Sequence, residues 1–149
     1  MPVKVDLQND EACADIPSEQ RFRDWVEASL QASYRQLEQT IRIVDEAESH
    51  DLNRRYRSKD APTNVLAFPT DADYLDYDCL GDLVICAPVV SAEAATQGKT
   101  AEAHWAHLVV HGMLHLQGYD HQETADTRDM ERLEIKILDT LGYTNPYND

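Results

Sequence analysis

The segment from His111 to His121 constrains the fold most, because its three histidines have the spacing H-x-x-x-H-x-x-G-x-x-H. Residues four apart on a helix lie on the same face, so His111 and His115 can reach one ion. Gly118 can end that helix in a left-handed conformation, and the following turn can bring His121 to the same ion. Three neutral nitrogen ligands with an open fourth position are typical of catalytic zinc. The pattern therefore predicts a metal-dependent hydrolase that holds one zinc ion per chain.

Two observations bear on the choice of ligands. His104, His107, His111 and His115 follow one helical stripe at steps of three, four and four. Stripe spacing alone would allow His107 and His111 as the ligand pair, but only His111 and His115 are followed by a turn and a third histidine. We expect His104 to be a hydrogen-bonded, half-buried residue, and His107 to be either a core residue or a support for a ligand. Imidazole suits several divalent ions, and cellular availability and the three-histidine set favour zinc.

The residue after the first histidine separates two kinds of hydrolase. Metzincin proteases share this spacing but carry a glutamate directly after the first histidine, where it serves as general base. Gly112 occupies that position here. A metallopeptidase-like hydrolase is therefore an alternative that lacks its usual base.

Three further blocks accompany the histidines: Trp105-Ala-His107 just before them, the segment 52–69 and the segment 81–85. The second reads Leu-Asn-Arg-Arg-Tyr-Arg-Ser-Lys-Asp, followed by Thr-Asn-Val-Leu-Ala-Phe-Pro, and the third reads Gly-Asp-Leu-Val-Ile. Together with the histidine segment, and in their order along the chain (52–69, 81–85 and 105–121), they resemble the YbeY family of bacterial zinc-dependent endoribonucleases from about residue 40 onward. The resemblance implies cleavage of single-stranded RNA, with roles in ribosomal RNA maturation and ribosome quality control. It matches Arg57 to the family's catalytic arginine and implies the ribosome or ribosomal proteins as partners.

A second alternative hypothesis is that the protein is not an enzyme. A ribosome-associated factor with a structural zinc would have a fourth protein ligand and would unfold when the metal is removed. No cysteine or fourth histidine lies conveniently within the motif.

Length and composition indicate one soluble domain spanning residues 1–149. A chain of 149 residues with 42% hydrophobic and 28% charged residues suits a single globular core. It contains no run approaching the roughly 18 apolar residues of a membrane-spanning helix. Its three cysteines form no C-x-x-C pair, which favours a reducing cytoplasm over a disulfide framework.

The net charge of −15 opposes non-specific binding of a polyphosphate chain. The cations are unevenly distributed, however, because four of the thirteen Lys and Arg fall within residues 51–60: Arg54, Arg55, Arg57 and Lys59. A guanidinium can hold two phosphate oxygens at once and can stabilise charge that develops at phosphorus. We expect a selective enzyme that contacts a few phosphates of RNA and acts weakly on RNA without partners.

Hydrophobic periodicity and capping residues predict an α+β fold, with a small mixed sheet of about four strands and a zincin-like metal helix. The alternation of apolar residues predicts strands at 3–7, 40–44, 65–68 and 80–86. Helices are expected after Ser18, after Asp45 to about Tyr56, from Pro88, from Thr100 to Leu116, and from about Glu123 to Leu141, with Met130, Leu133 and Ile137 on the apolar face of the last.

Overall fold

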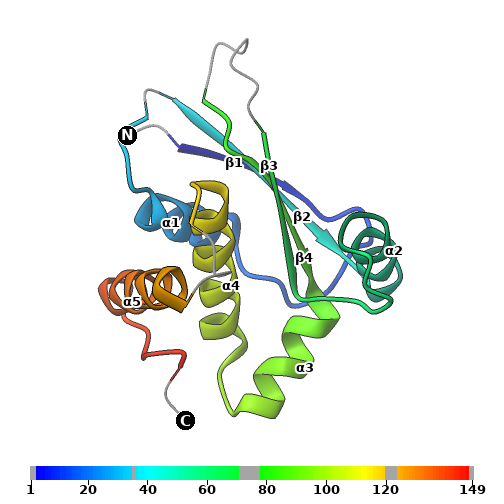
Figure 1. Ribbon diagram of the computed structural model, residues 1–149. Coiled ribbons are helices and arrows are strands. Elements are labelled where there is room, and N and C mark those ends of the chain that lie inside the picture. The colour runs from blue at the N-terminus through cyan, green and yellow to red at the C-terminus, as the bar shows by residue number, and fades with distance from the viewer. Residues whose placement is uncertain (1–2, 35, 71–77, 120–123, 148–149) are drawn as a thin grey trace.

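The protein forms a four-stranded mixed sheet with helices on both faces, described here from a computed structural model (Figure 1). The structure describes residues 3–34, 36–70, 78–119 and 124–147. The strands are β1 (Val3–Gln8), β2 (Leu37–Val44), β3 (Val65–Pro69) and β4 (Gly81–Cys86), arranged in the order β1-β2-β4-β3. β1 pairs parallel with β2, β2 parallel with β4, and β3 antiparallel with β4. The predicted α+β class with a mixed sheet is therefore confirmed.

Local sequence explains where most helices begin and end. The described helices are α1 (Glu19–Ser29), α2 (Glu46–Arg57), α3 (Ala87–Gln97), α4 (Ala101–Leu116) and α5 (Thr124–Thr140). The side chains of Ser18, Asp45 and Thr100 accept hydrogen bonds from backbone N–H groups in the first turns of α1, α2 and α4. These three predicted N-caps satisfy donors that the first turn of a helix leaves without partners.

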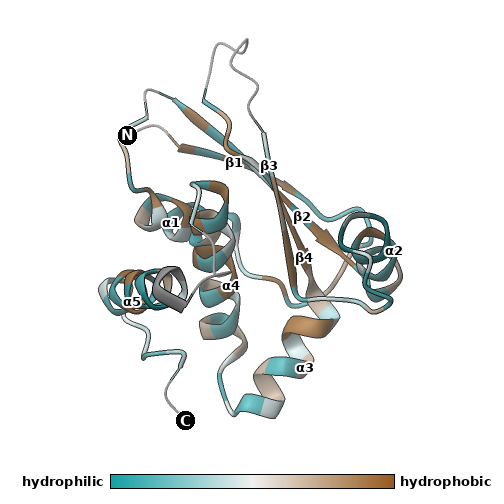
Figure 2. Ribbon diagram, in the orientation of Figure 1, coloured by the Kyte–Doolittle hydropathy of each residue, from teal (hydrophilic) through white to brown (hydrophobic). Residues whose placement is uncertain are grey.

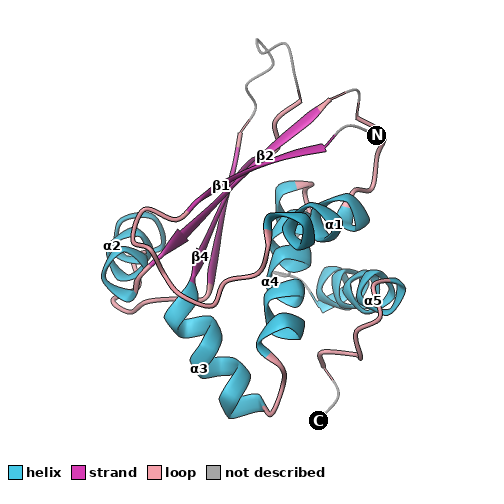
Figure 3. Ribbon diagram, turned by 180° about the vertical axis from the view of Figure 1, so that it is seen from behind, coloured by secondary structure: helices cyan, strands magenta, loops and turns pink. Residues whose placement is uncertain are grey.

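The two faces of the sheet are packed differently. One face carries Ile41, Leu83 and Ile85 and packs with α1, α4 and α5 into the main hydrophobic core. The opposite face carries Val44 and Val84, in a smaller cluster to which α2 contributes Leu52. Figure 3 shows α2 on one side of the sheet and α1, α4 and α5 on the other. In Figure 2 hydrophobic and hydrophilic residues alternate along β1 and β2, and α2 is mostly hydrophilic, as expected for a helix that covers little of the core.

Strand β2 is longer than its sequence predicts. It begins at Leu37 instead of residue 40, and Gln39 lies on its buried face. The amide of Gln39 donates a 2.9 Å hydrogen bond to the carbonyl of Gly81. A buried polar residue interrupts the apolar alternation from which a strand is predicted, and its partner comes from a distant part of the chain.

Candidate metal centre

The histidines of α4 lie along one side of the helix, as their spacing predicts. α4 packs between the sheet and α5 (Figure 1). Leu116 is its last helical residue, and Gly118 follows with φ +99°. The N–H of Gly118 donates a hydrogen bond to the carbonyl of His115 at 3.0 Å, and the N–H of Tyr119 donates one to the carbonyl of Leu114 at 3.1 Å. The predicted role of Gly118 in ending the helix is confirmed.

His111 and His115 turn their outer ring nitrogens toward one point. The two Nε2 atoms are 3.1 Å apart, and the ring centroids are separated by 4.6 Å. Two nitrogens bound to one tetrahedral zinc ion at about 2.0–2.1 Å lie roughly 3.3 Å from each other. The observed separation fits two ligands of the same ion.

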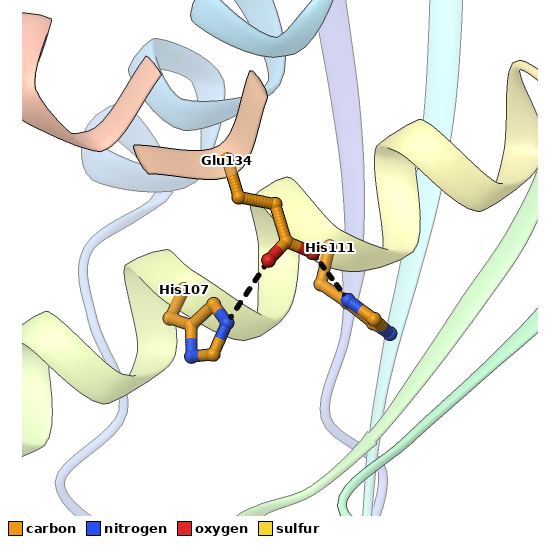
Figure 4. A group of neighbouring side chains, drawn as sticks. All are labelled: His107, His111 and Glu134. Atoms are coloured by element: carbon orange, nitrogen blue, oxygen red, sulfur yellow. Dashed lines mark hydrogen bonds and ion pairs between the residues drawn. The ribbon is translucent and has the colours of Figure 1, made fainter. Parts of the chain in front are cut away.

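Glu134 of α5 reaches from the neighbouring helix to the other ring nitrogen of His111 (Figure 4). The carboxylate is fully buried, and its Oε1 lies 2.5 Å from His111 Nδ1. Its Oε2 accepts a hydrogen bond from the hydroxyl of Tyr147 and lies 3.5 Å from Nε2 of His107. Burial raises the pKa of Glu134, but the hydrogen bonds from His107, His111 and Tyr147 and the charge of His111 lower it to about 2. The carboxylate is therefore ionised near neutral pH.

The contact with Glu134 selects one tautomer of His111. A carboxylate only accepts hydrogen bonds, so His111 in the neutral form that binds a metal carries its proton on Nδ1 and keeps the lone pair on Nε2 for a ligand. Figure 4 shows this second nitrogen pointing away from Glu134. A carboxylate behind a histidine in this way orients metal-binding imidazoles in many proteins and raises their basicity.

A second set of donors overlaps this one. The nearest donor atoms of His107, His111 and Glu134 all lie within 4.8 Å of one another and could also hold a metal ion. Both sets contain His111, and they differ in whether Glu134 is a ligand or supports one. The residues present thus fit a divalent metal ion by either set.

The other two histidines of the stripe are tied to different carboxylates. His104 is buried, and its Nε2 lies 2.8 Å from Oε1 of Glu93 on α3, which also accepts a 3.0 Å hydrogen bond from Asn64. Burial lowers the pKa of His104, although Glu93 opposes this effect. The expectation that His104 is a hydrogen-bonded residue is confirmed, and it is more deeply buried than predicted. His107 contacts Glu134 and Tyr147, so of its two predicted roles the support for a ligand agrees better with the contacts.

A cavity of about 900 Å³ opens beside His104 and His107. Its walls come from the residue before β3, the end of α3, one side of α4 and the segment 144–147, and they include Asn64, Glu93 and Tyr147. Polar side chains from four separate parts of the chain thus meet beside this half of the histidine stripe. The cavity is large enough for a small ligand or a short part of a polymer.

Gly112 brings α4 close to the sheet. A Cβ atom at this position would lie 2.6 Å from Cδ2 of Leu83 on β4 and 3.4 Å from Cγ2 of Val65 on β3. The side at which a metzincin would carry its glutamate therefore faces packed apolar side chains. A carboxylate there could not be accommodated without displacing the side chain of Leu83.

The structure brings together two of the three predicted ligands. His111 and His115 converge, whereas His121 lies outside the described residues. Arg57 is the exposed last residue of α2, a helix that packs through Leu52 on the sheet face opposite α4. The loop that follows Arg57 leads to Asn64 on the cavity wall.

Two residues of the site were missed from the sequence: Glu134 and Tyr147. Glu134 did leave a signal, because it lies four residues after Met130 and three before Ile137, on the apolar face of α5. A glutamate is almost never fully buried unless it is paired. Tyr147 left no comparable signal, since it lies in an irregular segment without periodicity.

Converging imidazoles on one helix, backed by a buried carboxylate, could hold a metal ion, and such an arrangement is typical of metal-dependent hydrolases. Residues 6–142 match the family model described as endoribonuclease YbeY. The chain is 52% identical over 149 residues to the endoribonuclease YbeY of Pseudomonas entomophila (strain L48), covering 99% of this chain and 94% of that protein. The protein belongs to the endoribonuclease YbeY family, and it is a hydrolase of the nuclease class.

The fold also resembles a solved structure. The solution structure of TM1509 from Thermotoga maritima aligns with a TM-score of 0.58 at 21% identity, covering 99% of each chain. At this identity the likeness concerns the fold alone.

Proposed function

We propose that this protein is a zinc-dependent endoribonuclease that hydrolyses phosphodiester bonds of single-stranded RNA. We further propose that it acts in the cytoplasm, in ribosomal RNA maturation and ribosome quality control, with the ribosome or ribosomal proteins as partners. The observation that carries the proposal is the convergence of His111 and His115 in a member of the endoribonuclease YbeY family. Within the described residues, no helix is both long and apolar enough to cross a membrane.

The proposed zinc ligands are His111, His115 and His121. Two donors on one tetrahedral zinc ion lie roughly 3.3 Å apart. The 3.1 Å between the Nε2 atoms of His111 and His115 is close to this value, and Glu134 contacts His111 at the opposite ring nitrogen, Nδ1. This arrangement favours Glu134 as the support of His111 over Glu134 as a ligand.

When bound, zinc supplies Lewis-acid chemistry: it lowers the pKa of a coordinated water from 15.7 to about 7 and draws charge from a phosphoryl oxygen. The chain's own residues then have distinct tasks. Glu134 keeps the proton of His111 on Nδ1, and the cavity beside His107 receives part of the RNA chain. The attacking oxygen comes either from water or from the ribose 2′-hydroxyl, which only RNA possesses.

Arg57 is proposed to bind the scissile phosphate and to stabilise its developing charge. The structure distinguishes it from its neighbours in the basic block. Arg54 and Arg55 each form a 3.3 Å ion pair with Asp51. Among the described residues, Arg57 forms no ion pair, so its guanidinium is available for a ligand. Lys59 is exposed and could contribute a further phosphate contact.

The proposal is tested by cleavage of a labelled single-stranded ribosomal RNA fragment with zinc-loaded protein. His115→Ala, Arg57→Ala and a chelated sample should each lose cleavage, while the matched control Arg55→Ala should retain most of it. Water attack leaves a 3′-hydroxyl end, and 2′-hydroxyl attack leaves a cyclic phosphate, so the product ends distinguish the two routes.

Other results would favour other functions. Cleavage that persists in His115→Ala would indicate a contaminating nuclease and leave the RNA activity unsupported. No cleavage by any sample, together with one tightly held zinc per chain, would favour a non-enzymatic ribosome-associated factor with a structural zinc. Hydrolysis of an unstructured protein that is abolished by chelator would support the metallopeptidase alternative. The close packing around Gly112 argues against that alternative.

A further inference from the structure

Tyr147 closes a hydrogen-bond chain that begins at the histidines. Its hydroxyl donates to Oε2 of Glu134 and lies 3.3 Å from Nε2 of His107, while Oε1 of Glu134 faces His111. Both oxygens of the buried carboxylate therefore have a partner, one on α4 and one in the segment after α5. Two fixed oxygens prevent rotation of the carboxylate about its last bond.

The direction of these hydrogen bonds follows from the acceptor. Burial and the carboxylate of Glu134 raise the pKa of Tyr147 far above neutrality, so the phenol stays protonated and donates. Its oxygen can then accept from His107, whose Nε2 must carry a proton to donate. Tyr147 and His111 thus both direct protons toward one carboxylate, and His107 Nε2 lies 3.5 Å from the same group.

The segment that carries Tyr147 is held in place independently of the hydroxyl. Lys99, just after α3, donates a 3.0 Å hydrogen bond to the carbonyl of Pro146, and the side chain of Asn145 accepts from the N–H of Tyr147 at 2.8 Å. The ring of Tyr147 packs edge-to-face on His107, with centroids 5.3 Å apart. Removal of the hydroxyl alone should therefore leave the segment and the ring where they are.

We infer that Tyr147 is a positioning residue of the metal centre, which acts through Glu134 to hold the His111 ring in its ligating orientation. This inference rests on the proposed function, because it takes His111 as a zinc ligand. Without the phenol hydroxyl, Oε2 keeps only the 3.5 Å approach of His107, and the carboxylate can turn away from His111. The C-terminal segment then contributes to metal affinity without supplying a ligand.

Tyr147→Phe tests this inference, with Tyr143→Phe as the matched control. The hydroxyl of Tyr143 also donates to a glutamate, Glu102 Oε2 at 2.7 Å, but this pair does not reach the histidines. Zinc affinity of the full chain is measured by competition with a chromophoric chelator, and the visible spectrum of the cobalt-loaded protein reports ligand geometry. Loss of an outer support typically weakens metal binding 10- to 100-fold. We expect about tenfold for Tyr147→Phe, more for Glu134→Gln, and less than twofold for Tyr143→Phe.

The double variant shows whether Tyr147 acts through Glu134. If it does, Tyr147→Phe should cost much less zinc affinity in the Glu134→Gln background than in the wild type. An unchanged zinc affinity in Tyr147→Phe would overturn the inference, as would a changed KM for RNA with unchanged zinc affinity. In both cases a wild-type protein that binds zinc and cleaves RNA would leave the proposed function standing. A wild type that binds no zinc would overturn both.

Discussion

Substitution of Gly112 by alanine tests how closely α4 approaches the sheet. The added Cβ would lie 2.6 Å from Cδ2 and 3.3 Å from Cδ1 of Leu83, and 3.4 Å from Cγ2 of Val65. Leu83 is fully buried, so it cannot swing into solvent to relieve the contact. Ordinary carbon–carbon contacts lie at about 3.5–4.0 Å, and the Leu83 side chain, the strand or the helix must therefore shift by about 1 Å.

Two opposing effects determine how much Gly112→Ala changes the free energy of unfolding. Alanine is favoured over glycine within a helix by about 1 kcal/mol, which would stabilise the folded state if the position were open. Overpacking of a well-packed core costs about 1–3 kcal/mol. We expect Gly112→Ala to lower the free energy of unfolding by about 1 kcal/mol, the difference between these effects near the middle of the range.

Urea unfolding of the chelator-treated protein, followed by circular dichroism, measures this difference without a contribution from metal binding. Leu83→Val removes the clashing methyl position and supplies the control. The double variant Gly112→Ala/Leu83→Val should be less destabilised than the sum of the two single variants. If Gly112→Ala is instead about 1 kcal/mol more stable than the wild type, the close contact does not exist and the packing argument against a base at this position fails.

Three further predictions concern capping, a loop and pH. Thr100→Ala should cost about 1 kcal/mol of stability through the lost N-cap of α4, measured by urea unfolding against Thr96→Ala as an exposed control. Ser49→Ala should cost about 1–3 kcal/mol, because the buried hydroxyl donates to the carbonyl of Thr63 at 2.8 Å and accepts from its N–H at 2.9 Å; an unchanged urea midpoint would contradict this. The lowered pKa of His104 means that the unfolded chain takes up the proton first, so stability should fall as pH drops below 6.5 and level off below the folded-state pKa. The fall in stability below pH 6.5 should be smaller in His104→Asn than in the wild type. An identical slope of urea midpoint against pH in the variant and the wild type would refute this role of His104.

Local signals accounted for most of the fold. The caps at Ser18, Asp45 and Thr100 and the turn at Gly118 act within a few residues, so the sequence alone located them. Gln39 shows where local reasoning ended, because its hydrogen-bond acceptor is the carbonyl of Gly81, 42 positions away. A pattern of apolar residues carries no information about such a partner.

The candidate site likewise contains residues that local sequence predicts and a residue that it does not predict. His111 and His115 were predictable because four residues make one helical turn, and their separation depends only on α4. The support of His111 depends instead on how α5 packs against α4, since Glu134 is 23 positions further along the chain. Packing between helices is set by the whole core, and the spacing of the histidines says nothing about it.

The cations of residues 51–60 show that composition alone does not identify which arginine can bind a phosphate. Counting cations in residues 51–60 treats Arg54, Arg55 and Arg57 alike, and only the resemblance to a family singled out Arg57. The structure adds a physical distinction, because the carboxylate of Asp51 lies at ion-pair distance from the first two. An arginine already paired must lose that partner before it can bind a phosphate, so its contribution to RNA binding is smaller than its charge suggests. If Arg57 carries the phosphate contact, Arg57→Ala should reduce the salt dependence of RNA binding by about one phosphate contact, and Arg55→Ala by less.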